Sequence, residues 1–158
     1  MPQPIDKQPE ITQARRVKAT LACMSLLRVM HDAVEYYEGD LEAFVIYMAV
    51  ACASIGGAMR DPGAALGVHN GLPAERHYRP ISRRAIAAST GLPRETVRRK
   101  ISQMVERGYL VEEPRGVRTR PGVLMERRNS EFTAALIKEI ERSSAELARI
   151  DKAVQAIS

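Results

Sequence analysis

The sixteen residues from Ile86 to Ile101 (IAASTGLPRETVRRKI) constrain the fold more than any other part of this chain. Ala87 is small enough to stand where two helices touch, and Gly91, four residues later, accepts the positive φ that a tight turn between helices requires. Leu92 offers an apolar side chain to fill that turn, and apolar residues recur with helical spacing in the second half of the segment. The segment therefore predicts two helices that cross at a steep angle over a very short turn.

Signals for helix ends bracket this pair of helices. Ser82 can cap the first helix, and Gly91 ends it. Pro93 is tolerated in the first turn of a helix, so the second helix is expected to start there and to run to about residue 107. Gly108 follows as the predicted end of the second helix.

A β-hairpin is predicted directly after the second helix. Residues 109–111 (YLV) form a short run of β type. The stretch 114–122 holds two Pro and two Gly, which favour turns, and residues 123–125 (VLM) are apolar again. We therefore expect the tip of the hairpin within 114–122 and its return strand at 123–125.

The two predicted helices resemble the helix-turn-helix of bacterial transcription regulators, and the hairpin resembles the wing of the winged-helix branch. This resemblance extends over residues 81–125, and the chain order of helices, helix-turn-helix, wing and terminal helix is similar to that of MarR-like dimers. It implies a mainly α fold with a small β-hairpin wing, in which a winged helix-turn-helix domain is flanked by long N- and C-terminal helices. It also implies binding to double-stranded DNA, with the second helix in the major groove and the wing on the minor groove or backbone.

The same resemblance assigns roles to individual side chains. Base contacts at the start and outer face of the second helix are expected for Arg94, Glu95, Arg98 and Arg99, because Arg can pair with guanine and Glu can accept from cytosine. Contacts to the DNA backbone, which position the protein without specifying sequence, are expected for Arg83, Arg84, Lys100 and Gln103. Wing contacts are expected for Arg115, Arg118 and Arg120. For each of these Arg side chains, a solvated surface charge is the plainer alternative.

Positive charge is concentrated in the same part of the chain. The whole chain carries a net charge of +5. Residues 75–128 contain 14 Lys or Arg, 13 of them Arg, against six Asp or Glu, whereas the remaining residues contain 10 against 13. A basic block between acidic flanks is typical of a polyanion-binding protein, and Arg favours bidentate contacts to phosphate and guanine.

Amphipathic helices are predicted on both sides of the basic block. The first follows a possible cap at Thr12 and runs to about residue 38, and the last begins near residue 129 and runs to the C-terminus with a seam of period 3.5. The two apolar faces consist of Val17, Leu21, Met24, Leu27, Met30, Val34 and Tyr37, and of Leu136, Ile140, Leu147, Ile150, Val154 and Ile157 with the polar Ser143. Since terminal helices form the dimer in MarR-like proteins, we expect a homodimer. Packing of the two faces on each other within one chain is the alternative.

A third helix, over residues 41–60, is apolar nearly all round, which indicates burial on most sides. Its uncharged stretch, 43–59, is too short and too rich in Ala and Gly to predict a membrane span, so no membrane partner is expected. We divide the chain into a flexible tail (1–11), an N-terminal helical dimerisation arm (12–60), a loop (61–80), the winged helix-turn-helix domain (81–128) and a C-terminal dimerisation helix (129–158).

A small-molecule effector is a further hypothesis. Its pocket would lie between the helix at 41–60 and the dimerisation arms, lined by Tyr36, Phe44, Tyr47 and Met48. A plain packed core is the alternative interpretation of the same residues.

Catalysis, metal binding and secretion are not predicted. Cys23 and Cys52 lie in apolar helical stretches, so we expect them to be reduced and buried in a cytoplasmic protein. The His and Cys residues lack the spacing of metal ligands, no nucleophile stands beside a base, and no phosphate-binding loop is present, so neither metal, cofactor nor enzymatic activity is expected. The N-terminal residues lack the apolar region of a secretory signal.

The sequence therefore predicts a cytoplasmic, homodimeric transcription regulator that binds specific DNA sequences. The alternative is a winged-helix adaptor that binds a protein and has no specific DNA site.

Overall fold

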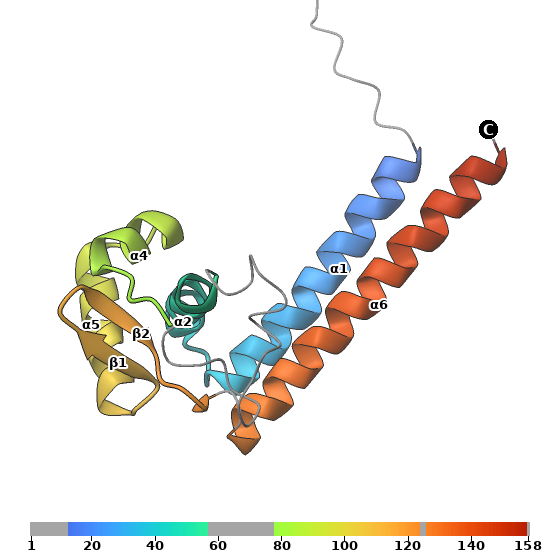
Figure 1. Cartoon of the computed structure of the whole chain (residues 1–158). Coiled ribbons are helices and arrows are strands. Elements are labelled where there is room, and N and C mark those ends of the chain that lie inside the picture. Colours follow the sequence, from blue (N-terminus) through green and yellow to red (C-terminus); the bar gives the residue numbers. More distant parts are fainter. Residues whose placement is uncertain (1–12, 57–77, 124–125, 158) are drawn as a thin grey trace, which may run out of the picture. The chain divides into compact units, whose positions relative to one another are not determined.

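The computed structural model describes residues 13–56, 78–123 and 126–157, which form five helices and a two-stranded sheet (Figure 1). In chain order the elements are α1 (Gln13–Tyr36), α2 (Leu41–Ile55), α4 (Arg83–Thr90), α5 (Arg94–Glu106), β1 (Leu110–Glu113), β2 (Gly116–Thr119) and α6 (Arg127–Ile157). This is the predicted mainly α fold, with a small hairpin after the helix-turn-helix and long terminal helices. The predicted tail at 1–11, the cap at Thr12 and most of the loop at 61–80 lie outside the described residues.

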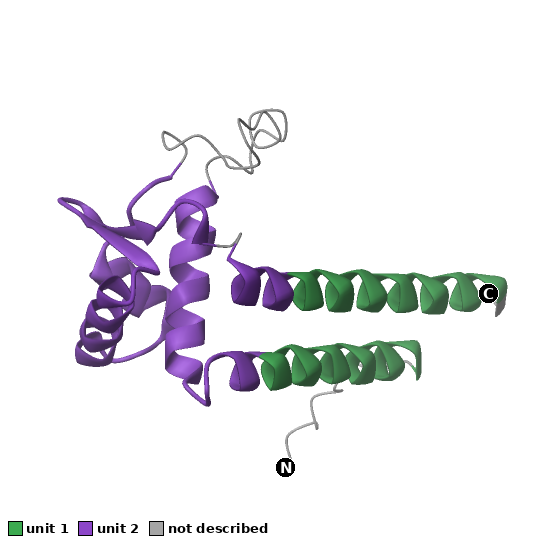
Figure 2. Ribbon diagram, turned by 90° about the horizontal axis from the view of Figure 1, so that it is seen from below, with its two compact units in different colours: residues 1–32, 134–158 green, residues 33–133 purple. Residues whose placement is uncertain are grey.

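The chain divides into two compact units, which Figure 2 shows in different colours. Unit 1 comprises residues 1–32 and 134–158, and unit 2 comprises residues 33–133. Helices α1 and α6 each contribute to both units. No described helix is long and apolar enough to cross a membrane.

Unit 2 is built around α2. This helix begins at its N-cap Asp40, whose side chain accepts a hydrogen bond from the backbone N–H of Ala43, and it contacts α4, α5 and β2. The core of the unit consists of Ile46, Tyr47, Val50, Ile86, Val97, Ile101, Met104, Leu110, Val117 and Val123. Helix α2, which was predicted to belong to the N-terminal arm, thus packs with the helix-turn-helix in one core.

The predicted ends of the two central helices are confirmed. The Ser82 hydroxyl accepts a hydrogen bond of 3.2 Å from the backbone N–H of Ala85, which caps α4. Gly91 ends α4 in the left-handed conformation, with φ of +71°, and Pro93 stands at the N-cap of α5. Gly108 has φ of +74° one residue beyond the C-cap of α5. These local signals therefore position both helices.

The hairpin is shorter than predicted. Strands β1 and β2 are antiparallel, with Leu110 opposite Thr119 and Glu113 opposite Gly116, so the turn between them holds only residues 114 and 115. The predicted return strand at 123–125 was wrong. The chain reverses earlier because Gly116 adopts φ of +143°, which favours glycine, and because Val117 supplies a buried apolar side chain immediately after it. Val123 is buried in the turn that follows β2, and residues 124–125 lie outside the described part.

A backbone bridge that the sequence did not predict attaches the start of the helix-turn-helix to the hairpin. The N–H of Ile81 donates to the carbonyl of Val117 at 2.8 Å, and the N–H of Val117 donates to the carbonyl of Ile81 at 2.9 Å. The buried Ser54 at the end of α2 also accepts a hydrogen bond from the backbone N–H of Thr119. Both contacts fix the position of β2 against the rest of unit 2.

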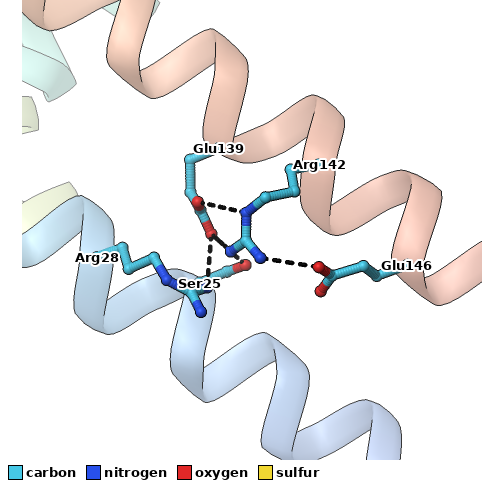
Figure 3. Close-up of polar contacts among 5 residues, drawn as sticks. All are labelled: Ser25, Arg28, Glu139, Arg142 and Glu146. Carbon is cyan, nitrogen blue, oxygen red and sulfur yellow. Dashed lines mark hydrogen bonds and ion pairs between the residues drawn. The ribbon is translucent and has the colours of Figure 1, made fainter.

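Unit 1 contains two antiparallel helical segments joined mainly by polar side chains. Glu139 of α6 accepts hydrogen bonds from Ser25 at 2.7 Å and Arg28 at 3.2 Å of α1, and from Arg142 of its own helix (Figure 3). Lys18 also forms an ion pair with Asp151. Among the described residues of unit 1, no apolar side chain is buried.

The two cysteines do not lie in a core. Both Cys23 and Cys52 are exposed, so the prediction that they are buried was wrong. Cys23 lies in the helical segment of unit 1 that has no buried apolar side chain. Cys52 lies two residues after the buried Val50, and two residues along a helix point to opposite sides.

Candidate nucleic-acid interface

The first two turns of α5 present charged side chains to solvent. The opposite face of α5 is held in the core by Val97, Ile101 and Met104, all of them buried. Because α5 is amphipathic, the face opposite these anchors points outward. All four side chains predicted to contact bases are exposed, namely Arg94, Glu95, Arg98 and Arg99.

These four side chains differ in their partners. Arg98 donates to both carboxylate oxygens of Glu95, at 3.0 and 2.5 Å. This hydrogen bond lowers the pKa of Glu95, so its carboxylate stays ionised at neutral pH. Arg99 lies 3.8 Å from Glu42 of α2, and Arg94 has no polar partner among the described residues. Arg94 is therefore available for an external anion, and the other two arginines are held in weak, exposed pairs.

The residues predicted to contact the DNA backbone do not share one environment. Arg84 and Gln103 are exposed, and Arg83 donates to Glu112 of β1 at 2.7 Å. The Lys100 side chain is only 11% exposed, and its ammonium group donates to Asp40 of α2 at 2.5 Å. Lys100 thus joins α5 to α2 and does not face solvent, because it lies three residues after Val97 and four before Met104, on the buried side of α5.

Only one of the three wing arginines is exposed. Arg115 lies in the hairpin turn and is exposed. Arg118 forms an ion pair with Glu113 across the hairpin, and its guanidinium lies 5.9 Å from the centre of the Tyr78 ring. Arg120 donates to the carbonyl of Gly108 at 2.5 Å and pairs with Glu126. Arg118 and Arg120 therefore hold the hairpin in place.

Arg79 was not among the predicted site residues. Its backbone N–H donates to the carbonyl of Ser54 at 2.9 Å, while its side chain is exposed and has no polar partner among the described residues. In the sequence, Arg79 is marked only as one of the cations of the basic block. It was not predicted as a site residue because the segment around it has the pattern of a loop. The structure adds it to the exposed cations of unit 2.

The residues predicted to line an effector pocket separate into two groups. Tyr36 and Tyr47 line a cavity in unit 2. Phe44 packs against Tyr37 and Phe132, with ring centres 5.5 and 6.0 Å apart, and neither Phe44 nor Met48 belongs to the cavity lining.

Across the three described ranges, no group of three or more His, Cys, Asp or Glu side chains is arranged to hold a metal ion.

Residues 75–114 match the model of the IclR helix-turn-helix domain. This segment is an IclR-type helix-turn-helix domain. The expected MarR-like membership is not supported, because the helix-turn-helix segment matches the IclR type. Comparisons with curated proteins and with solved structures gave no significant match.

The IclR-type domain covers α4, α5 and β1 of this chain. A domain of this type implies DNA binding in transcriptional regulation for this segment. The exposed arginines described above lie within this domain or directly beside it.

Proposed function

We propose that this chain is a sequence-specific transcription regulator that binds DNA as a homodimer, with α5 in the major groove and the hairpin turn on the minor groove or backbone. The observation that carries the proposal is the set of exposed, weakly paired arginines at the start of α5 and at the hairpin turn of an IclR-type domain.

Base reading is assigned to the start of α5. The Arg94 side chain has no polar partner among the described residues, so it can pair with a guanine edge without breaking an existing contact. Glu95 and Arg98 hold each other in a pair exposed by 73 and 63%, so water screens their attraction and a base can replace either partner. Arg99 is equally accessible, since its contact with Glu42 is long.

Backbone contacts are assigned to Arg79, Arg84 and Arg115. Each side chain is exposed and has no polar partner among the described residues. Arginine suits this role because its planar fork matches phosphate geometry. Lys100 is left out of this set, since its pairing with Asp40 holds α5 against α2.

Dimerisation is assigned to the exposed apolar side chains of α1 and α6, all but one of which lie in unit 1. Eight of the nine exposed large apolar side chains of the described residues lie on α1 and α6, namely Val17, Met24, Leu26, Leu27, Val34, Ile137, Ile140 and Val154. Two grooves of about 400 and 390 Å³ are lined by residues of both helices, which leaves surface on both helices open to a partner. A second copy of the same helices would bury these faces in a four-helix arrangement.

The polar cluster around Glu139 would then set the register of the helices (Figure 3). Its carboxylate is 10% exposed and is held by two arginines and a serine. A fully paired polar group at a helix interface is a known device for fixing helix register.

The proposal is tested by selecting bound sequences from a pool of random DNA at two salt concentrations. A motif with two half-sites about one helical turn apart is expected, with affinity that falls steeply with salt. Arg94→Ala should weaken binding by about 1–3 kcal/mol and relax the sequence preference at one position in each half-site. Arg115→Ala should weaken binding to all sequences and reduce the salt dependence by about one phosphate contact.

Arg127→Ala is the matched control, because its side chain is 93% exposed and lies outside the helix-turn-helix. If Arg94→Ala and Arg115→Ala bind DNA as tightly as Arg127→Ala does, the assigned interface is wrong. If no sequence is enriched and all binding disappears at moderate salt, the protein-binding adaptor becomes the better hypothesis.

A further inference from the structure

Two carboxylates at the start of α2 lie against cations of α5. Asp40 is the N-cap of α2, and Glu42 lies in the first turn of this helix. The Glu42 carboxylate is 3.8 Å from the guanidinium of Arg99 and 3.9 Å from the ammonium of Lys100. All four residues belong to unit 2, so the helix that supports α5 also presents negative charge to the part of α5 assigned to DNA.

The pair between Asp40 and Lys100 fixes the start of α2 against α5. The Asp40 carboxylate accepts hydrogen bonds from the Lys100 ammonium at 2.5 Å and from the backbone N–H of Ala43 at 3.0 Å. Burial alone would raise the pKa of Asp40, but these hydrogen bonds outweigh it and lower that pKa, so Asp40 is ionised at neutral pH. Because the charge of Lys100 is thus matched, Arg99 is the cation left for Glu42 among the contacts of the described residues.

Glu42 approaches only one part of the Arg99 guanidinium. The two side chains face each other through Nη2 of Arg99, which has no other polar partner among the described residues. A guanidinium is a planar fork with five N–H donors, more than one carboxylate can use, so a second edge stays open for two parallel hydrogen bonds. Since the Arg99 side chain is 53% exposed, this open edge can reach a molecule outside the domain.

We propose that Glu42 is a positioning residue for DNA specificity: it holds Arg99 by one edge, presents the other edge to a guanine and keeps Arg99 from the phosphates. This inference rests on the proposed function, in which Arg99 reads a base. Asp40 and Lys100 contribute by holding the helix that carries Glu42 at a fixed place beside α5.

This arrangement distinguishes a guanine edge from a phosphate. The two acceptors of guanine can bind the open edge of Arg99 while Glu42 stays in place. A phosphate elsewhere requires Arg99 to leave Glu42, and an exposed pair with a phosphate gains little over the exposed pair that it replaces. Glu42 therefore weakens binding to wrong sequences without weakening the contact to the right base, and this difference is what specificity requires.

The test measures the affinity of the full chain for the selected motif and for DNA of unrelated sequence at one salt concentration. Glu42→Gln removes the charge and keeps the length of the side chain. Affinity for unrelated DNA should rise about two- to fivefold, the factor that an exposed ion pair contributes, whereas affinity for the motif should not rise. The ratio of the two affinities should therefore fall about two- to fivefold, and the base preference should relax at one position in each half-site.

Two comparisons show whether Glu42 acts through Arg99. Glu106→Gln removes the same charge at the far end of α5, where the side chain is exposed, and should leave the ratio unchanged. In an Arg99→Ala background, Glu42→Gln should no longer change the ratio. A merely structural loss at the start of α2 would scale both affinities by the same factor, so the ratio also separates positioning from folding.

The possible failures are distinguishable. An unchanged ratio in Glu42→Gln overturns the role of Glu42 and leaves the proposed function standing. The same holds if the ratio falls equally in Glu106→Gln, or if it still falls in the Arg99→Ala background. If the unsubstituted chain selects no DNA sequence, the proposed function fails and the role of Glu42 fails with it.

Discussion

At the scale of single residues, Gly116 is the position where one added atom should do most damage. A Cβ at this residue would lie 2.2 Å from the carbonyl oxygen of Ile81, in backbone that is itself part of the bridge to Val117, and φ of +143° is strained for any other residue. Gly116→Ala should lower the free energy of unfolding by about 2–5 kcal/mol, measured by urea denaturation, because overpacking and backbone strain add.

Gly91→Ala is the control for this substitution. Gly91 also has positive φ, at +71°, but a Cβ there meets no atom within 4 Å. The cost should therefore be only the conformational one, about 1–2 kcal/mol. Equal losses for the two variants would contradict the close contact between Gly116 and Ile81.

At the scale of elements, the pairing of α1 with α6 should depend on acid pH through Glu139. Hydrogen bonds from Arg142, Ser25 and Arg28 lower the pKa of Glu139 from its ordinary value of 4.5 to about 2. Because the folded pKa is the lower one, the stabilisation is complete above pH 4.5 and is lost as the pH falls from 4.5 towards 2. Urea denaturation, followed by circular dichroism at a series of pH values, should show the free energy of unfolding falling over this range.

Glu139→Gln should be less stable near neutral pH and should lose this part of the pH dependence. Glu131→Gln is the matched control on the same helix, since Glu131 is 66% exposed and pairs only with the exposed Arg127. The role of Glu139 is refuted if both variants keep the pH profile of the unsubstituted protein.

At the scale of the whole molecule, the apolar faces of α1 and α6 should set the oligomeric state. Ile140 is 58% exposed and Leu27 is 69% exposed in the single chain, and burial of the remaining surface in a dimer is worth about 1–2 kcal/mol each. Ile140→Glu should therefore shift the protein from dimer to monomer in sedimentation experiments. The affinity of Ile140→Glu for DNA with two half-sites should fall towards its affinity for DNA with a single half-site.

Ala145→Glu places the same charge at another exposed position of α6, about 140° around the helix from Ile140, and should leave the dimer intact. A monomeric unsubstituted protein, or a dimer that survives Ile140→Glu, would show that the two terminal helices do not form the interface assigned to them.

Much of the fold could be predicted because its signals are local. Ser82, Gly91 and Gly108 mark helix ends through their own backbone and side-chain chemistry, and the apolar spacing of α5 identifies its buried face. The exposure of Arg94 follows from the same spacing. The sequence alone therefore predicted a helix-turn-helix with charged residues on its outer face.

The rest depended on contacts between residues far apart in the chain. Val117 is buried against Ile81 and β2 begins at Gly116, so the hairpin closes earlier than turn-forming residues alone indicate. Lys100 is an ordinary exposed cation in the sequence until Asp40, sixty residues away, pairs with it. Sequence periodicity reports which side of a helix is apolar, but only tertiary structure decides whether another element covers that side. For this reason the sequence determined the helix-turn-helix and its charge, whereas the register of the hairpin, the partners of its arginines and the uncovered faces of α1 and α6 were decided by the tertiary structure.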